Sequence, residues 1–120
     1  MGNDRLGPWG EALAEKYLKK KGYRTLCRNF RCKWGEIDLI VENRKFIVFV
    51  EVKLRKSADF ANARDFVDFR KQQRIISTAS FYFTSHESEK QPRFDVIEIY
   101  APAGTETLKP TINHLEDAFQ

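Results

Sequence analysis

The sequence predicts a single α/β domain in which helices flank a mixed β-sheet, with the elements in the order α-β-β-β-α-β. Two apolar runs, residues 35–41 and 46–55, are rich in the β-branched and aromatic side chains that favour strands. The segments on either side of this pair, residues 8–22 and 67–83, have apolar side chains at helical spacing. A chain of 120 residues with 42% hydrophobic content can build one core, so we expect residues 1–120 to form one domain.

The first helix is expected between Pro8 and Gly22, because proline is favoured in the first turn of a helix and glycine just after the last. Glu11 lies at the edge of the apolar stripe of this helix and can reach either the sheet or the solvent. A glutamate in the first turn is also favoured by the helix dipole alone, so both interpretations of Glu11 stay open. The stripe that would pack on the sheet consists of Gly10, Leu13, Ala14, Tyr17 and Leu18.

Residues 23–30 are expected to form the first strand, followed by a turn at Trp34 and Gly35. The next two strands are joined by a polar link in which Asn43 tolerates a positive φ angle, which is typical of a β-hairpin. In an antiparallel pair, the residue numbers of opposed positions have a constant sum, and a two-residue loop of Asn43 and Arg44 would set that sum. One face of the hairpin is then wholly apolar and consists of the pairs Val41 with Phe46, Leu39 with Val48, and Ile37 with Val50.

The other face of this hairpin is apolar near its turn and charged at its far end. Asp38 lies diagonally from Glu51, with Cα atoms roughly 7–8 Å apart, and Lys53 lies beside them. Glu36 is directly opposite Glu51 in this register, and such a like-charge pair destabilises a sheet. Apolar neighbours such as Phe49 imply that this face is covered, whereas a solvated surface with weak ion pairs is the alternative. If the face is covered, the carboxylates need a cation, or one of them becomes neutral.

The second helix is expected over residues 67–83, with Asp68 as its N-terminal cap. Lys71 lies one turn before Ile75 of the apolar stripe. Its ammonium can therefore either reach the solvent past an apolar stem or extend over the sheet to the acidic cluster.

The domain is expected to consist of a core, about residues 7–100, and a tail. The last strand of the core is expected over residues 93–100, in which we interpret Asp95 as a capping or structural acid. Residues 101–120 are interpreted as a tail that docks on the core through apolar side chains at positions i, i+3 and i+7, namely Ile112, Leu115 and Phe119.

Two acids and a lysine around a metal ion suit the hydrolysis of a phosphodiester. Asp38 and Glu51 would hold Mg²⁺ or Mn²⁺, and the backbone carbonyl of Val52 would complete the ligand set. Lys53 would orient or deprotonate the attacking water, or offset charge on the phosphate. Arg55, on the same face, is a candidate phosphate clamp.

Asp38 followed by Glu51, Val52 and Lys53 resembles the signature of the PD-(D/E)XK nucleases. The wider pattern is similar, over nearly the whole chain, to the YraN-like family of small bacterial proteins. This resemblance implies a restriction-endonuclease-like, Holliday-junction-resolvase-like fold, a metal site that Glu11 joins, and a homodimer that cuts two strands. The matching segments are Gly7-Pro8-Trp9-Gly10-Glu11, Asn29-Phe30-Arg31, Gly35-Glu36-Ile37-Asp38-Leu39-Ile40, Phe49-Val50-Glu51-Val52-Lys53-Leu54-Arg55, Lys71 and Arg93-Phe94-Asp95-Val96.

Two departures from the family pattern leave both acids in place. Ile37 precedes Asp38 where the name of the superfamily has a proline, but that position carries no chemistry. The stretch Ala61-Asn62-Ala63 stands where the family often has Gly-x-Pro, so the path of this loop stays open.

Net charge and its distribution are compatible with a nucleic-acid partner. The formal net charge is +4 and the pI is near 9.1, and basic side chains gather near the first strand and near the exit of the acidic site. Solvated faces would give the same clusters, and either Phe30 or Trp34 could stack on an exposed base. No element that reads a DNA groove is evident, so any specificity would be for shape or branching. The candidate nucleic-acid-binding residues are Arg55, Lys71, Arg31, Lys33 and Arg74.

Other classes of site have little support in the sequence. Cys27 and Cys32 fit neither a CxxC redox motif nor a zinc site, and His86 and His114 have no paired nucleophile. No signal peptide, membrane span or small-molecule cofactor is indicated, so we expect a cytoplasmic protein.

The sequence therefore predicts a metal-dependent endonuclease that cleaves structured or branched DNA through Asp38, Glu51 and Lys53, with Glu11 assisting. The alternative is a catalytically silent DNA- or RNA-binding module that acts within a partner complex. A purely structural interaction domain is a third class, but it leaves the acidic cluster unexplained.

Overall fold

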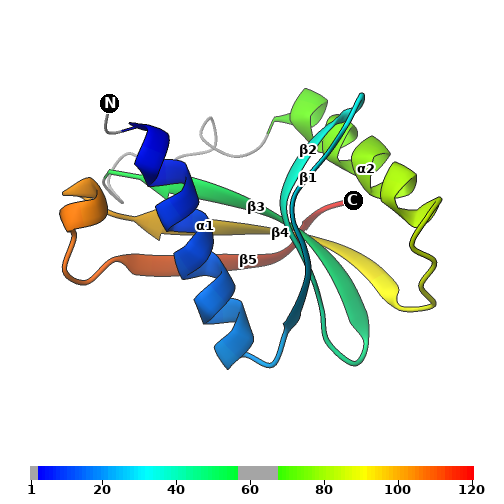
Figure 1. Cartoon of the computed structure of the whole chain (residues 1–120), viewed down its shortest axis with the longest axis horizontal. Coiled ribbons are helices and arrows are strands. Elements are labelled where there is room, and N and C mark those ends of the chain that lie inside the picture. Colours follow the sequence, from blue (N-terminus) through cyan, green and yellow to red (C-terminus); the bar gives the residue numbers. More distant parts are fainter. Residues whose placement is uncertain (1–2, 57–67) are drawn as a thin grey trace.

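The computed structural model describes residues 3–56 and 68–120, which form one five-stranded sheet with strands in the order β1-β2-β3-β4-β5 (Figure 1). Strands β3 and β4 pair in parallel, and the other neighbouring strands pair antiparallel. The elements in chain order are α1 (Asn3–Lys20), β1 (Arg24–Cys32), β2 (Gly35–Glu42), β3 (Phe46–Arg55), α2 (Phe69–Phe83), β4 (Gln91–Tyr100), the 3₁₀ helix η3 (Gly104–Glu106) and β5 (Thr111–Phe119).

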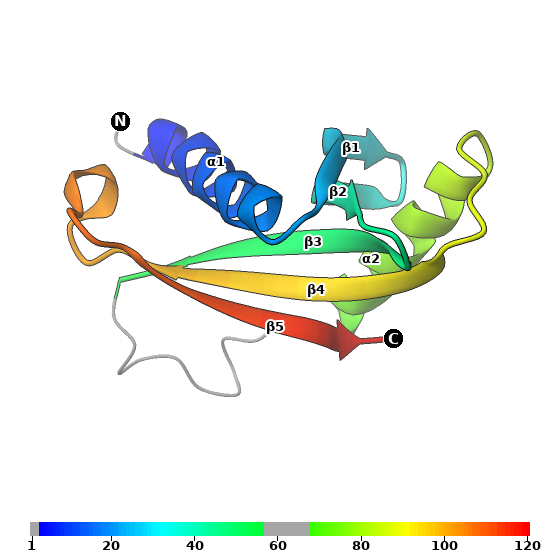
Figure 2. The same cartoon turned by 90° about the horizontal axis from the view of Figure 1, so that it is seen from below.

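This architecture confirms the predicted fold class, a mixed sheet flanked by helices. The expected order α-β-β-β-α-β is present, and β5 extends it by one strand. Helix α1 lies over β3 on one side (Figure 2), and its fully buried Ala14 and Leu18 pack in a core with Val48 of the sheet. Helix α2 covers a second core, in which Tyr82 packs edge-on against Phe49 with ring centroids 6.0 Å apart.

Helix α1 is longer at its start than expected. It begins at Asn3, so Pro8 lies inside the helix and not at its first turn. Proline has no backbone N–H, but only one helical hydrogen bond is lost this close to the N-terminus. The predicted end of the helix is confirmed, because Gly22 has φ 93° and donates its N–H to the Lys19 carbonyl at 3.0 Å.

The register predicted for the β2–β3 hairpin is wrong by two residues. Leu39 pairs with Val50 and Val41 with Val48, because the loop is longer than two residues. Asn43 closes this loop, since its Oδ1 accepts hydrogen bonds from the backbone N–H groups of residues 45 and 46 at 3.0 and 2.8 Å. A shift of two residues keeps the paired side chains of Leu39 and Val41 on their predicted face.

Strands β2 and β3 pair only next to their connecting loop and separate towards the first residues of β2. Their pairing covers only Leu39 to Glu42 of β2, whereas β1 pairs with β2 as far as Gly35. Ile37, predicted to lie opposite Val50 on the α1 side, instead packs in the core under α2. The strand edge of β3 beyond Val50 is therefore left without pairing to β2, and this geometry creates the candidate site.

Helix α2 has the predicted cap. It begins at Phe69, and the side chain of Asp68 accepts a hydrogen bond from the N–H of Lys71 at 2.9 Å. The predicted first residue of this helix, Val67, and the Ala61-Asn62-Ala63 loop lie outside the described residues.

The predicted C-terminal tail is in fact a strand of the sheet. Strand β5 pairs antiparallel with β4, which itself begins at Gln91 and not at residue 93. Ile112 packs against the core under α1, whereas Leu115 and Phe119 pack in the core under α2. The i, i+3, i+7 spacing therefore reflects strand alternation, because Ile112 faces one side of the sheet and Leu115 and Phe119 face the other.

The remaining residues considered in the sequence have structural roles. Cys27 and Cys32 are free, partly buried thiols, and the His86 ring stacks on Tyr82 with centroids 4.2 Å apart. Within residues 3–56 and 68–120, no helix is long and apolar enough to cross a membrane.

Candidate metal centre

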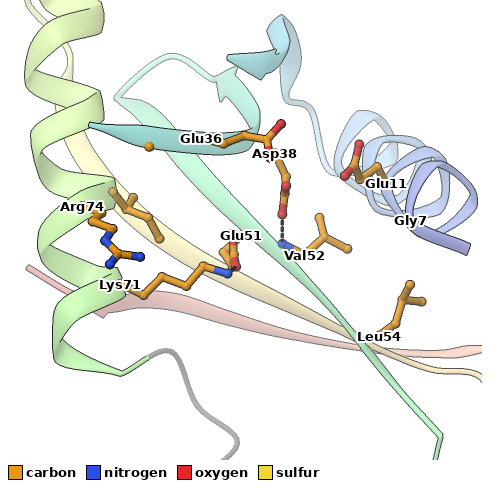
Figure 3. Close-up of a pocket in the computed structure, with 11 residues that line it drawn as sticks. Gly7, Glu11, Glu36, Asp38, Glu51, Val52, Leu54, Lys71 and Arg74 are labelled. Carbon is orange, nitrogen blue, oxygen red and sulfur yellow. Dashed lines mark hydrogen bonds and ion pairs between the residues drawn. The ribbon is translucent and has the colours of Figure 1, made fainter. Parts of the chain in front are cut away.

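A cavity of about 300 Å³ opens between α1, β2, β3 and α2, where β2 separates from β3 (Figure 3). Both helices and both strands contribute to its walls, which include the backbone edge of β3 at Val52. The charged side chains that line it are Glu11, Glu36, Asp38, Glu51, Lys71 and Arg74.

The side chain of Asp38 binds the edge of β3 at the point where β2 no longer pairs with it. Its Oδ2 accepts a hydrogen bond from the backbone N–H of Val52 at 2.8 Å. The N–H and C=O of one strand residue point to the same edge, so the Val52 carbonyl faces the same gap. Burial raises the pKa of Asp38 to about 8, with further contributions from the charges of Glu51 and then Glu11. The crowding of Asp38 and Glu51 expected from the sequence is therefore present, although the predicted register was wrong.

Glu51 is 6% exposed and forms an ion pair with the Lys71 ammonium, which extends from α2 across the face of the sheet (Figure 3). Of the two interpretations of Lys71, the structure therefore supports the contact with the acidic cluster. The Asp68 cap fixes the backbone of Lys71 in the first turn of α2. Glu51 thus has one positive partner, whereas no cation pairs with Asp38 among the described residues.

Glu11 projects from α1 beside β2 and is held by a residue that the sequence did not identify as part of the site. The Nδ2 of Asn29 donates a hydrogen bond to Glu11 Oε1 at 2.9 Å. Asn29 has φ 51° and lies on β1 between the pairs Arg28–Leu39 and Phe30–Ile37, so it is next to Asp38. Asparagine tolerates positive φ better than most residues, and this property was the available signal.

The donor atoms present fit a hard divalent cation. Asp38, Glu51 and the Val52 carbonyl are all oxygen donors, which Mg²⁺ and Mn²⁺ prefer. In the described part of the chain, no three Asp, Glu, His or Cys side chains come together as a metal-binding group. Mg²⁺ is often held by one or two carboxylates and retains several waters, so the two acids are a sufficient protein contribution.

Lys53 and Arg55 are on β3 but do not line the cavity. Lys53 lies in parallel register with Glu98 of β4, and it is partly buried. The side chain of Arg55 is 14% exposed and pairs with Glu98 at 3.3 Å, so its charge is compensated within the sheet. Neither residue therefore lines the cavity that Asp38 and Glu51 line.

The other predicted basic residues lie around the cavity. Arg74 lines it directly from α2. Arg31 pairs with Glu36 through its Nε at 2.6 Å, so Glu36 does not face Glu51 as the predicted register required. Lys33 lies in the β1–β2 turn, with its ammonium 4.9 Å from the centroid of the Trp34 ring.

Comparison with known proteins connects the whole site to one family. A model of the "Uncharacterised protein family UPF0102" matches residues 10–99, a range that holds Glu11, Asp38, Glu51 and Lys71. A UPF0102 protein of Caldanaerobacter subterraneus subsp. tengcongensis is 48% identical over 115 residues, which cover 95% of this chain and 93% of the relative. A UPF0102 protein of Caldicellulosiruptor bescii is 43% identical and one of Clostridioides difficile is 41% identical, each across 99% of this chain and 100% of the relative. The chain therefore belongs to the UPF0102 family, the YraN-like family that its sequence motifs resemble.

Proposed function

We propose that this protein is a metal-dependent endonuclease of the PD-(D/E)XK type, which cleaves structured or branched DNA. The observation that carries the proposal is the pair of carboxylates at the open edge of β3, of which Glu51 is buried and Asp38 is partly buried. Asp38 and Glu51 line one cavity, Asp38 contacts the backbone of Val52, and the pKa of Asp38 is raised to about 8. A bound cation would compensate both carboxylates and favour the ionised form of Asp38, which no cation pairs with among the described residues.

In this proposal, Asp38, Glu51 and the Val52 carbonyl hold Mg²⁺ or Mn²⁺. When bound, the ion supplies Lewis-acid chemistry and lowers the pKa of water. Glu11 assists from the far wall of the cavity, where Asn29 fixes its carboxylate.

Cationic side chains would bind the phosphate and assist the water in this proposal. Lys71 and Arg74 already line the cavity and would stabilise negative charge on the scissile phosphate. Lys53 is proposed to orient or deprotonate the water, as the motif implies, although Lys71 is the lysine that contacts Glu51.

Cleavage of labelled DNA tests this proposal. The panel contains single-stranded, duplex, flap and four-way-junction DNA, each with Mg²⁺, Mn²⁺ or EDTA. We expect metal-dependent cutting that falls at least about 100-fold in Glu51→Gln, since a ligand of the ion is lost. Glu42→Gln is the matched control, because Glu42 also forms ion pairs at the sheet but lies outside the cavity. No cutting by the wild-type protein, or equal cutting by Glu51→Gln, would contradict the proposal.

A second candidate is a nucleic-acid-binding module without catalysis, for DNA or RNA within a partner complex. The specific observation in its favour is the Lys71–Glu51 ion pair, which neutralises Glu51 without any metal. Binding that weakens with salt, persists in Glu51→Gln and is never followed by cutting would favour this candidate.

The proposed nuclease includes a homodimer, because two sites are needed to cut two strands symmetrically. Light scattering coupled to size-exclusion chromatography, with and without four-way-junction DNA, tests this part. A single protomer on a junction that is cut in both strands would contradict it.

A further inference from the structure

Trp34 is an exposed aromatic side chain next to the cavity. It lies in the β1–β2 turn, is 49% exposed, and directly precedes Gly35 and Glu36, which both line the cavity. A half-exposed indole contributes little to a folded core, and tryptophan is enriched where proteins bind partners. The position of Trp34 therefore suggests that a ligand of the cavity extends over this turn.

Close packing fixes the turn against α2. Gly35 has φ 154°, and a Cβ atom built there would lie 3.2 Å from Thr78 Oγ1 and 3.5 Å from the Cβ of Arg74. A side chain at this position would thus be strained and crowded. The contact holds the start of β2 beside Arg74, so Trp34 and Arg74 have a defined spacing at the cavity.

The cations around the indole are available for a ligand. Lys33 lies 4.9 Å from the Trp34 ring, and Arg74 lines the cavity. Neither side chain has an ion-pair partner within the described residues, whereas Arg31 is paired with Glu36. An aromatic platform beside free cations is the combination that binds a nucleic-acid strand, because bases stack on the ring and phosphates contact the cations.

The other aromatic residue expected to stack on a base is used inside the fold. Phe30 packs edge-on against Tyr82 of α2, with ring centroids 5.2 Å apart, and tilted against Phe81 at 6.4 Å. Phe30 is therefore engaged in the fold, whereas Trp34 is half-exposed next to the cavity.

We infer that Trp34 stacks on an unpaired base of a nucleic-acid strand whose backbone passes Lys33 and Arg74 into the cavity. This inference rests on the proposed function and deepens it, because it specifies the substrate class. The ligand is a strand with unpaired bases beside the phosphate to be cut, as in a single strand, a flap or the centre of a junction. A blunt, fully paired duplex offers no base to Trp34 and binds more weakly.

Tryptophan fluorescence tests the inference directly. The chain has two tryptophans, so Trp9→Phe leaves Trp34 as the only reporter. This variant is titrated in EDTA with a DNA single strand, an RNA single strand of the same sequence, and the blunt DNA duplex. We expect saturable quenching by single strands of DNA, RNA or both, and binding to the duplex that is about tenfold weaker. Equal quenching by duplex and single strands, or no quenching by either strand, would overturn the inference.

Matched variants identify the residues involved. Trp34→Ala should weaken single-strand binding about tenfold and leave duplex binding unchanged, and Trp34→Phe should restore part of it. Leu108→Ala is the control, because Leu108 is 97% exposed and lies near η3. Lys33→Gln should lower the salt dependence of binding by about one phosphate contact, whereas Lys45→Gln in the β2–β3 turn should not. Unchanged binding by Trp34→Ala would overturn the inference.

The two proposals fail in distinguishable ways. Titrations in EDTA need no catalysis, so they report on the Trp34 platform whether or not the protein cuts DNA. Quenching without cleavage would support the Trp34 platform and contradict the nuclease, whereas cleavage without quenching would do the reverse.

Discussion

Asp95 and Asp38 lie in two regions of the same sheet, the first buried and the second partly buried, and have opposite surroundings. Asp95 on β4 is fully buried, and it accepts hydrogen bonds from Arg93 at 2.8 and 2.9 Å, from His114 Nε2 at 2.7 Å and from the N–H of Asp117 at 3.0 Å. Burial opposes ionisation there, but the hydrogen bonds from His114 and Arg93 lower the pKa of Asp95. Asp38 on β2 has one backbone donor and an acid as its neighbour, so burial raises its pKa to about 8.

This difference separates a stabilising acid from a functional one. Asp95 connects β4 to β5 and to the Arg93–Tyr23 contact, so its charge is compensated and holds the fold together. Glu51 pairs with Lys71, whereas Asp38 has no cationic partner among the described residues, so the ionised form of Asp38 is not compensated at the cavity. Uncompensated charge of this kind is typical of sites that bind a cation or a substrate.

The largest expected effect is on the free energy of unfolding, which should depend on Asp95 and not on Asp38. Asp95→Asn should lower the free energy of unfolding by about 3–5 kcal/mol, because the buried Arg93 guanidinium loses its buried counter-charge and the hydrogen-bond network with His114 is disturbed. Asp38→Asn should not lower it at pH 7, because the folded chain already holds the Asp38 carboxyl mostly in its neutral form, and an amide oxygen can still accept the hydrogen bond from the Val52 N–H. Urea denaturation of both variants makes the comparison, and equal losses would contradict it.

The second effect concerns the metal, which should stabilise only one region. At a Mn²⁺ concentration about 100 times its dissociation constant, the free energy of unfolding of the wild type should rise by about 2.7 kcal/mol. Asp38→Asn and Glu51→Gln should lose this gain, whereas Glu42→Gln should keep it. Thermal unfolding with and without Mn²⁺ is the measurement. A gain that survives in Asp38→Asn would place the ion elsewhere.

The third effect is on pH dependence, which should have opposite signs in the two regions. The pKa of Asp38 in the folded chain is about 8, above its usual value of 3.8. Between these values the folded chain holds a proton that the unfolded chain has lost, so this contribution to stability falls as pH rises, by at most about 1.4 kcal/mol per pH unit. The lowered pKa of Asp95 makes its contribution present at neutral pH and lost in acid.

Denaturation of the wild type and Asp38→Asn from pH 5 to pH 8 measures the contribution of Asp38. The substitution should flatten the fall in stability across this range. An unchanged slope would show that Asp38 ionises normally.

The smallest expected effect comes from the counter-charge of Glu51. Lys71→Met should lower the free energy of unfolding by about 1 kcal/mol, because the lysine side chain is 45% exposed and the pair is partly screened. Lys90→Met is the control, since Lys90 pairs with Glu42 at 2.8 Å outside the cavity. The gain in stability with Mn²⁺ should be larger in the Lys71 variant than in the wild type, because the ion takes over the charge of the lysine, whereas the Lys90 variant should gain as much as the wild type. Equal gains in the two variants would contradict this role of Lys71.

The prediction that the two acids are neighbours does not depend on the part of the register that was wrong. Side chains alternate along strands, so a shift of two residues kept Asp38 and Glu51 on facing positions. The cap at Asp68 was equally predictable, because it depends on the local chain only. Asp95 was interpreted as structural, and its four hydrogen bonds agree with this interpretation.

Features that depend on distant contacts were not predictable. The separation of β2 from β3 involves the positive φ of Asn29 and the close contact of Gly35 with α2, and neither follows from strand periodicity. This separation exposes Val52 to the cavity, and Lys53 is not among the cavity residues. The role of His114 was missed because its strand looked like a docking tail.

The parallel pairing of β3 with β4 has a consequence for the order in which the protein folds. Phe46 pairs with Gln91, a separation of 91 − 46 = 45 residues, whereas β1, β2 and β3 pair through short turns. Long loops close more slowly than hairpins, so the β1–β2–β3 meander should form before the centre of the sheet closes. Asp38 and Glu51 belong to this early unit, and Lys71 belongs to the later crossover. The transition state for folding should therefore contain two adjacent acids without their lysine, and a divalent cation present during refolding should speed its formation.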